Sequence, residues 1–240
     1  MTSILNYNNV KVQKKKNSFL IQISKTNEKK NKTLFNSLVE SKNINTISLN
    51  KCSKTNICSL EFKAHYTNTL KNLLSNNNYL DYLDLISLFS CIKKQIDFLF
   101  ENNIGILLFN INDIIAIKHN KNDKAHTFLF VNSNYLFDID NNNLVVTSSF
   151  DKRNKDIFIS PELVTLNSIP FQIPYKSCFF SFSLLVSFCI EGKKIDFLNP
   201  ISWNVDDFIN ILEPIDNTKL FWALLRCQEK DPNDRFLLLI

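Results

Sequence analysis

The most hydrophobic segment of the chain, CFFSFSLLVSFCI from Cys178 to Ile190, places the strongest constraint on its fold. A membrane-spanning helix needs about 20 consecutive apolar residues, so this segment is too short to cross a bilayer. A helix that is apolar on all sides is typical of a protein interior. We therefore predict a central buried helix, no membrane span, and a core built around this helix.

The length and composition of the chain support such a core. The chain has 240 residues, 45% of them hydrophobic, which suits one large domain or two small lobes. The N-terminal sequence MTSILNYNNVKV lacks both a charged start and a useful apolar stretch, so we expect no secretory signal. Most cysteines lie inside apolar stretches, which predicts reduced, core-filling thiols in an intracellular protein. They are Cys52, Cys58, Cys91, Cys178, Cys189 and Cys227.

Glycine is almost absent from the chain. There are two, Gly105 and Gly192, against 21 phenylalanines and long tracts of Asn, Lys and Ile. Amino acids with AT-rich codons dominate this bias, so we expect an AT-rich genome, such as that of a protist or of a large DNA virus that infects one. Two isolated glycines cannot form the Gly-rich loop that lets backbone amides approach phosphates.

The charge pattern leaves one alternative function open. The formal net charge is +5, and much of the excess lies in two basic runs, 11–17 and 25–33. Such runs can bind the phosphates of a nucleic acid or of an anionic membrane. They are more often solvated faces or loose termini. A basic nucleic-acid-binding protein is therefore an alternative, and nucleic acid is not the expected partner.

Hydrophobic periodicity divides the chain into a β-rich part and a helical part. Residues 1–62 contain short β-like pieces between Lys- and Asn-rich loops, with one helix at LFNSLVES. Helices follow, the longest with apolar residues spaced by three, four and six positions between Leu80 and Leu99. The pattern predicts an α+β fold with a reduced β-rich lobe over 1–62 and a mainly helical lobe over 63–240.

Two strand-like runs interrupt the helical part, at Asp113–His119 and His126–Asn132, and the polar turn NKNDKA joins them. We expect irregular structure between Ser133 and Pro174. Further helices are predicted in SWNVDDFINIL and NTKLFWALLRCQEK, and Pro232 in DPND should end the last of them.

Three motifs of the C-terminal half, FISPEL, KSCFFSFSLLV and LLRCQEKDPNDR, carry a family resemblance. Their order and spacing resemble the large lobe of a eukaryotic-type protein kinase. In that family a Ser-Pro-Glu or Ala-Pro-Glu step closes the activation segment, and its Glu pairs with an Arg from a DPxxR-like stretch. The resemblance implies an ion pair between Glu162 and Arg235. In the alternative, these motifs are chance turn sequences of an unrelated helical domain.

The resemblance places residues without catalytic groups at the positions of kinase chemistry. Kinases need a catalytic-loop Asp, an Asn and a second Asp for magnesium, and a lysine on the phosphates. Here Leu108 stands at the catalytic Asp and Asn110 at the loop lysine. Asp113 stands at the metal-binding Asn, and Asn132 at the magnesium-binding Asp. Cys178 replaces the central-helix Asp that ties down the catalytic loop in active kinases.

A different register would move the magnesium position to Asp138. We interpret Asp138 and Asp140, in FDIDNN, as turn or strand-edge residues. Neither register supplies a catalytic base.

The nucleotide-binding positions are also weak. Lys25 in FLIQISK could imitate the strand lysine, with Glu40 as its helix partner, although an exposed strand-end lysine is the commoner situation. The segment LEF, with Glu61 at its centre, is the candidate for the hinge that would contact the nucleotide.

Other chemistry has little support in the sequence. Cys52 and Cys58, with His65 downstream, are spaced too widely for a usual zinc site, and we expect no metal. His119 and His126 flank a loop between strands, where we expect solvent-exposed turn residues and no acid/base catalysis.

These observations predict a catalytically inactive kinase-like domain, a pseudokinase of the sort expected in a large DNA virus, located in the host cell or the virion. It would act as a regulatory or binding module for a protein partner and need no cofactor. Two alternatives remain at this stage. One is an atypical serine/threonine protein kinase that retains ATP and magnesium, and the other is the basic nucleic-acid-binding protein.

Overall fold

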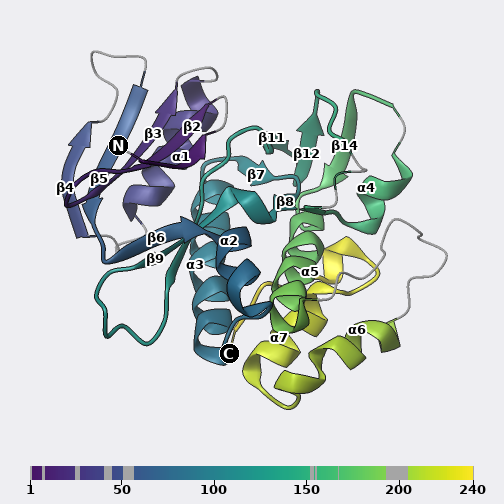
Figure 1. Cartoon of the computed structure of the whole chain (residues 1–240). Helices are drawn as coiled ribbons and strands as arrows, with labels where there is room; N and C mark the ends of the chain where they lie inside the picture. The colour runs from purple at the N-terminus through teal and green to yellow at the C-terminus, as the bar shows by residue number, and fades with distance from the viewer. Residues whose placement is uncertain are drawn as a thin grey trace.

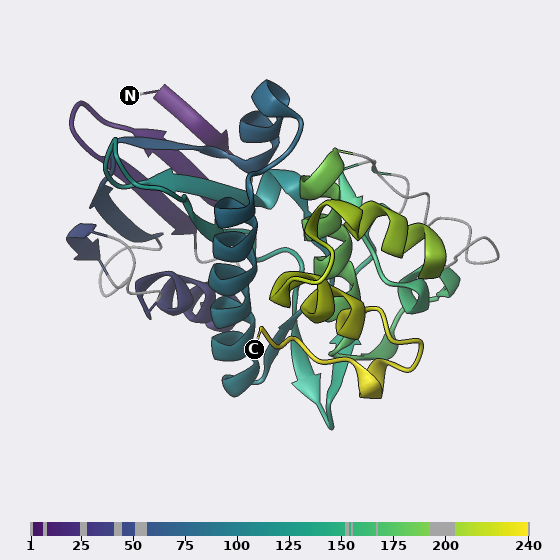
Figure 2. The ribbon, with the colours of Figure 1, turned by 90° about the horizontal axis from the view of Figure 1, so that it is seen from below.

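A computed structural model describes residues 2–6, 9–24, 28–40, 45–50, 57–151, 154, 156–166, 168–192 and 205–239 of the chain (Figure 1). The fold is mixed, with helices and several antiparallel sheets, as the α+β prediction requires. A five-stranded sheet and one helix form the N-terminal side (Figures 1 and 2). A four-stranded sheet, called the second sheet below, lies on the other side with most of the helices. One connected cluster of buried side chains extends through both sides.

The N-terminal sheet is antiparallel, with the strand order β1-β2-β3-β5-β4. Alternate residues of β3, Phe19, Ile21 and Ile23, are buried, because successive side chains of a strand point to opposite faces. Helix α1 (Glu28–Glu40) connects β3 to β4 and buries Leu34 and Phe35. The strands are β1 (Thr2–Asn6), β2 (Val10–Lys14), β3 (Phe19–Ser24), β4 (Asn45–Asn50) and β5 (Ile57–Lys63).

Strands as well as helices lie beyond residue 63, in the part that the sequence predicts to be mainly helical. Strand β6 (Tyr66–Thr69) pairs with β9 (Ile114–Lys118), which pairs with β10 (Thr127–Phe130). The strands predicted at Asp113–His119 and His126–Asn132 are therefore confirmed, and an extra strand lies beside them. Isoleucines that are buried on both faces of β9 explain its central place in this sheet.

Two helices follow β6, and each has a side-chain N-cap. Thr69 accepts a hydrogen bond from the Asn72 amide at the start of α2 (Leu70–Asn77), and Asp81 accepts one from Asp84 at the start of α3 (Tyr82–Glu101). These caps satisfy amides that have no partner within the helix. Helix α3 packs against β10, α1 and α5, as its predicted apolar face requires.

Between Ser133 and Pro174 the prediction of irregular structure is wrong for β11, β12 and β14, which form a sheet with β7. The strand order of this sheet is β14-β12-β11-β7. Asn141 and Asn142, with φ of 47° and 63°, form the turn between β11 and β12; both residues need positive φ in a type I′ hairpin, which asparagine tolerates. The strands are β7 (Ile104–Ile106), β11 (Leu136–Asp140), β12 (Asn143–Val146) and β14 (Phe171–Pro174).

The predicted central helix is confirmed as α5 (Ser177–Glu191). Every residue from Ser177 to Ile190 is buried except Phe188, which is partly exposed. Helix α5 lies between the second sheet and the C-terminal helices α6 (Val205–Leu212) and α7 (Lys219–Cys227) (Figures 1 and 2). It ends at Gly192, whose φ of 70° suits glycine and whose close approach to the Asn78 carbonyl leaves no room for a side chain.

Pro232 does not end the last helix. Helix α7 stops at Cys227, where the Gln228 amide donates to the Leu225 carbonyl oxygen. Pro232 instead begins a short 3₁₀ turn, Pro232–Asp234, for which its fixed φ is well suited. The C-terminal strand-like tail then returns along α7, with the Phe236 amide donating to Arg226.

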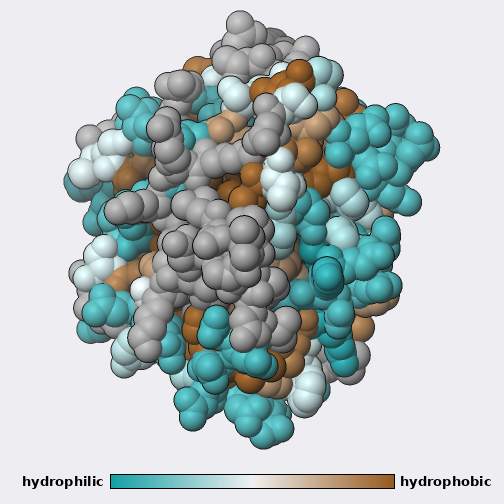
Figure 3. Space-filling view, turned by 90° about the vertical axis from the view of Figure 1, so that its right-hand side faces the viewer, coloured by the Kyte–Doolittle hydropathy of each residue, from teal (hydrophilic) through white to brown (hydrophobic). Residues whose placement is uncertain are grey.

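Among the described residues, no helix has the length and apolar character needed to cross a membrane. On the side of the molecule shown in Figure 3, hydrophobic and hydrophilic residues mix in small patches. The large apolar side chains exposed in the described ranges are Ile57, Tyr79, Tyr82, Leu83, Ile169, Ile209, Trp222, Phe236 and Leu238.

Candidate functional site

The Ser-Pro-Glu step joins the C-terminal loop through the expected ion pair. Ser160 is extended, Pro161 opens the short helix α4 (Pro161–Thr165), and Glu162 follows in its first turn. The guanidinium of Arg235 donates from Nη1 to Oε2 of Glu162 at 3.1 Å and from Nη2 to Oε1 at 2.5 Å. Such bidentate geometry is specific to arginine among the cationic side chains.

The two partners differ in burial. The side chain of Arg235 is 1% exposed and that of Glu162 is 23% exposed, so the predicted pair is present but only its cation is fully buried. Arg235 Nε also donates to the Glu229 carbonyl oxygen at 2.8 Å, and its guanidinium lies 4.9 Å from the centre of the Phe180 ring. These contacts tie α4 and the C-terminal loop to the first turn of α5.

The segment at the catalytic-loop position is apolar and buried. Leu107 and Leu108 follow β7 and have no exposed surface. They belong to a second hydrophobic cluster under the second sheet, separate from the main core. The other buried members of this cluster are Phe137, Leu144, Val146, Ile157, Ile159, Leu163 and Ile173. Apolar packing therefore holds this segment in place.

The structure brings together Asp113 and Asn132, the two residues that the kinase resemblance places at the magnesium-binding positions. Asn132 Nδ2 donates to Oδ2 of Asp113 at 2.9 Å, and both residues are buried. The Val131 amide donates to the Asp113 carbonyl oxygen at 2.9 Å, and the Asn134 amide donates to Oδ1 of Asn132. Compared with the kinase pattern, the Asp and the Asn have exchanged positions. The two side chains therefore bind each other through this hydrogen bond.

The turn between β1 and β2 reaches the same region. Asn9 is buried, and its Nδ2 donates to the Ser133 hydroxyl oxygen, next to Asn132 in the chain. The Asn9 carbonyl oxygen accepts from the Ser24 amide at 2.8 Å. These two hydrogen bonds join the turn to Ser133 and to the end of β3.

The loop-lysine position, Asn110, has a structural role. It lies in β8 (Phe109–Asn110), which pairs with β13 (Ile157–Phe158). Its Oδ1 accepts from the Asn112 amide at 2.8 Å and caps the 3₁₀ turn Ile111–Asp113. An amide in this position cannot supply the charge of a lysine.

Cys178, at the position of the central-helix Asp, is fully buried in the first turn of α5. Burial raises the pKa of its thiol far above the ordinary value, so the thiol stays neutral. A neutral thiol is a weak acceptor and cannot anchor a loop backbone as a carboxylate does.

Of the candidate nucleotide-binding residues, Lys25 lies outside the described residues, and Glu40 is exposed at the last position of α1. Glu61 lies in the middle of β5, so the LEF segment is part of a strand. Lys15 and Ser18 each donate to the Glu61 carboxylate at 2.5 Å, and these two hydrogen bonds lower its pKa. The Glu61 carboxylate therefore links β5 to the turn between β2 and β3.

Two further predictions are wrong. Cys58 is disulfide-bonded, and the free cysteines within the described ranges are Cys91, Cys178, Cys189 and Cys227. His126 is not a free turn residue, because its Nδ1 lies 2.9 Å from Oδ2 of Asp84 and both side chains are largely buried. No group of three potential metal-ligating side chains occurs in the described ranges.

Asp138 and Asp140 lie in β11, in the middle and at the end of the strand. Asp138 is exposed and pairs with Lys29 of α1 at 2.9 Å. This exposed pair joins the second sheet to α1.

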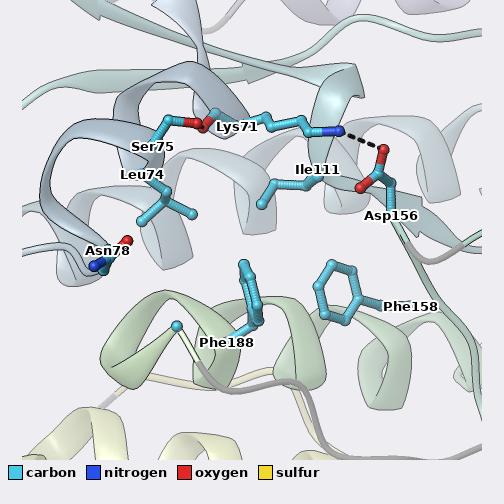
Figure 4. Close-up of a pocket in the computed structure, with 9 residues that line it drawn as sticks. Lys71, Leu74, Ser75, Asn78, Ile111, Asp156, Phe158 and Phe188 are labelled. Carbon is cyan, nitrogen blue, oxygen red and sulfur yellow. Dashed lines mark hydrogen bonds and ion pairs between the residues drawn. The ribbon is translucent and has the colours of Figure 1, made fainter.

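Sequence reasoning missed a groove between α2, β13 and α5. Its floor is apolar, with Leu74, Phe158 and Phe188 pointing into the hollow, and the Phe158 and Phe188 rings lie 5.6 Å apart (Figure 4). Lys71 reaches across one edge to Asp156, with 2.7 Å between Nζ and Oδ2. The groove has a volume of about 230 Å³. Its residues come from four distant segments, so no local pattern could reveal it.

The groove is linked to the catalytic-loop position. Asp156 also accepts from Nδ2 of Asn112 at 2.9 Å, and Asn112 follows the loop that contains Leu108.

Comparison with known proteins adds no relative: no protein-family model and no curated protein matches this chain.

Proposed function

We propose that this chain is a degenerate protein-kinase-like domain that works as a binding or regulatory module and does not transfer phosphate. Three features support the kinase-like fold. The Glu162–Arg235 pair joins the two motifs that suggested it. A buried helix lies between those motifs. An antiparallel sheet precedes these motifs, and its strand β3 is followed by helix α1. Kinases carry the phosphate-binding lysine on a strand and its glutamate partner on the helix that follows.

The observation that carries the loss of catalysis is the burial of Leu108. A general base must hold a lone pair within hydrogen-bond reach of the substrate proton. Leu108 has no such group and has no exposed surface. The neighbouring carboxylate, Asp113, is buried and bound to Asn132. A substrate hydroxyl would find no acceptor at this position.

A binding role fits the groove between α2, β13 and α5. Apolar pockets with a few placed polar groups are the usual form of a binding site. The apolar floor suits one apolar side chain of a protein partner, while the Lys71–Asp156 pair at the rim can bond to the partner's backbone. A viral or cellular regulatory protein is the partner class that we propose.

A phosphotransfer assay tests this function. We expect no transfer of radiolabelled phosphate from Mg-ATP to the protein itself or to generic protein substrates, because no base or free metal ligand is present at these positions. An active protein kinase assayed in parallel is the positive control. Labelled substrate that disappears in the Asp113→Asn variant would overturn the proposal.

A further inference from the structure

A concentration of lysines lies at one end of the N-terminal sheet. Lys14 ends β2 and pairs in register with Phe19, which pairs with Phe62 at the end of β5. The β2–β3 turn, with Lys15 and Lys16, is therefore next to Lys63. The bond from Lys15 to Glu61 fixes this neighbourhood.

The β9–β10 loop adds to the same end. The His65 amide donates to the carbonyl oxygens of Lys118 and His119, at 2.8 and 3.1 Å. The loop then carries Lys121 and Lys124, both exposed. Both ribbon views place this loop on the same side as the β2–β3 turn (Figures 1 and 2).

We call this surface the basic face, and it consists of Lys14, Lys15, Lys16, Lys63, Lys118, Lys121 and Lys124. Within the described ranges its carboxylates are Glu61, which Lys15 already binds, and Asp123, which caps the Asn120 amide. Seven lysines and two carboxylates give this face a net charge of +5, which equals the formal net charge of the whole chain.

We infer that the basic face binds the phosphodiester backbone of a double-stranded nucleic acid. Lysines distributed over a surface bind phosphates as point charges, through release of the counterions of the nucleic acid. None of the large apolar side chains exposed in the described ranges belongs to this face. We therefore expect this face to bind its partner through electrostatic attraction.

The absence of apolar groups on this described face argues against other partners. Peripheral membrane helices bury an apolar face in the lipid in addition to their basic residues. Protein interfaces are depleted in lysine and use aromatic and arginine anchors. Single strands stack their bases on aromatic side chains. The aromatic residues beside this face do not offer a free ring surface, because Phe19 and Phe62 are buried and Tyr66 is partly buried against His126.

The test is fluorescence anisotropy with short labelled duplexes of DNA and of RNA, between about 50 and 200 mM salt. We expect the logarithm of the binding constant to fall linearly with the logarithm of the salt concentration. A triple variant with one change in each segment, Lys16→Gln, Lys63→Gln and Lys121→Gln, should reduce that slope by about three, since each phosphate contact contributes about one. The stronger of the two duplexes identifies which nucleic acid is bound.

The matched control removes the same charge elsewhere, with Lys94→Gln, Lys219→Gln and Lys230→Gln, all exposed lysines on helices or in the C-terminal loop. Its slope should equal that of the unchanged protein. The inference fails if both triple variants weaken binding equally, if no salt-dependent binding to duplex is observed, or if phosphatidylserine vesicles or single strands bind more tightly than duplex. The groove is not changed in either variant, so these outcomes do not depend on the proposed regulatory function.

Discussion

The Leu185→Asp variant should fail to give soluble, folded protein. Leu185 has no exposed surface and lies in the middle of α5, a helix that packs against α3, α6 and α7. Burial of a leucine side chain contributes about 1.5–3 kcal/mol, and an unpaired buried carboxylate costs several kcal/mol more. Together these losses approach a total stability of about 5–15 kcal/mol. Soluble yield and circular dichroism melting measure the effect.

Two control variants distinguish the effect of placing a charge in the core from the effect of changing the residue. Leu185→Met keeps the volume of the side chain and should cost less than about 1.5 kcal/mol. Leu83→Asp introduces the same charge at a position that is 50% exposed, so its melting temperature should stay close to that of the unchanged protein. Normal expression and melting of Leu185→Asp would show that α5 is not the centre of the core.

The second large effect concerns Glu162 and Arg235. Removal of either partner, as Glu162→Gln or Arg235→Met, should lower the free energy of unfolding by about 3–5 kcal/mol, because the remaining charge loses its partner. The double variant should lose clearly less than the sum of the two single losses. Urea unfolding of all four proteins gives the coupling energy.

The exposed pair Lys93–Asp97 on α3 provides a comparison for this cycle. A pair spaced by four residues on a helix surface is worth about 0.3–0.5 kcal/mol. Its coupling energy should therefore be several times smaller than that of Glu162 and Arg235. Additive losses for Glu162 and Arg235 would mean that the two side chains do not meet, and would remove the main support for the kinase-like fold.

Strong local patterns allowed several elements to be predicted from the sequence. Helix α5 is apolar on all sides, and α3 repeats its apolar residues with helical spacing, so both were identified. Glu162 and Arg235 are distant in the sequence, and only the resemblance connected them. In each case the decisive information was either local or shared with a known family.

The second sheet was missed because its strands are short. Strands of three to five residues, such as β7 and β12, give too few positions for alternation to be recognised. The pair Asn141–Asn142 between apolar runs was an available hairpin signal. The groove, the Asn9–Ser133 contact and the Asp84–His126 contact depend on long-range packing, for which a single sequence has no local signature.

From these long-range contacts we propose that the chain's own side chains occupy the place where the kinase resemblance would put the phosphates of a nucleotide. Asp113 binds Asn132, and Asn9 of the β1–β2 turn binds Ser133 beside it. A nucleotide with its magnesium ion would have to break both contacts and separate two buried side chains. The free energy needed to break these contacts would weaken the binding of the nucleotide.

Thermal unfolding in increasing concentrations of Mg-ATP tests this claim most directly. A ligand that prefers the folded state must raise the melting temperature as its concentration rises. We expect a melting temperature that does not change with Mg-ATP, in the unchanged protein and in an Asn9→Ala variant that still retains the Asp113–Asn132 bond. A concentration-dependent rise in the unchanged protein would contradict the claim and would favour an atypical kinase that retains its nucleotide.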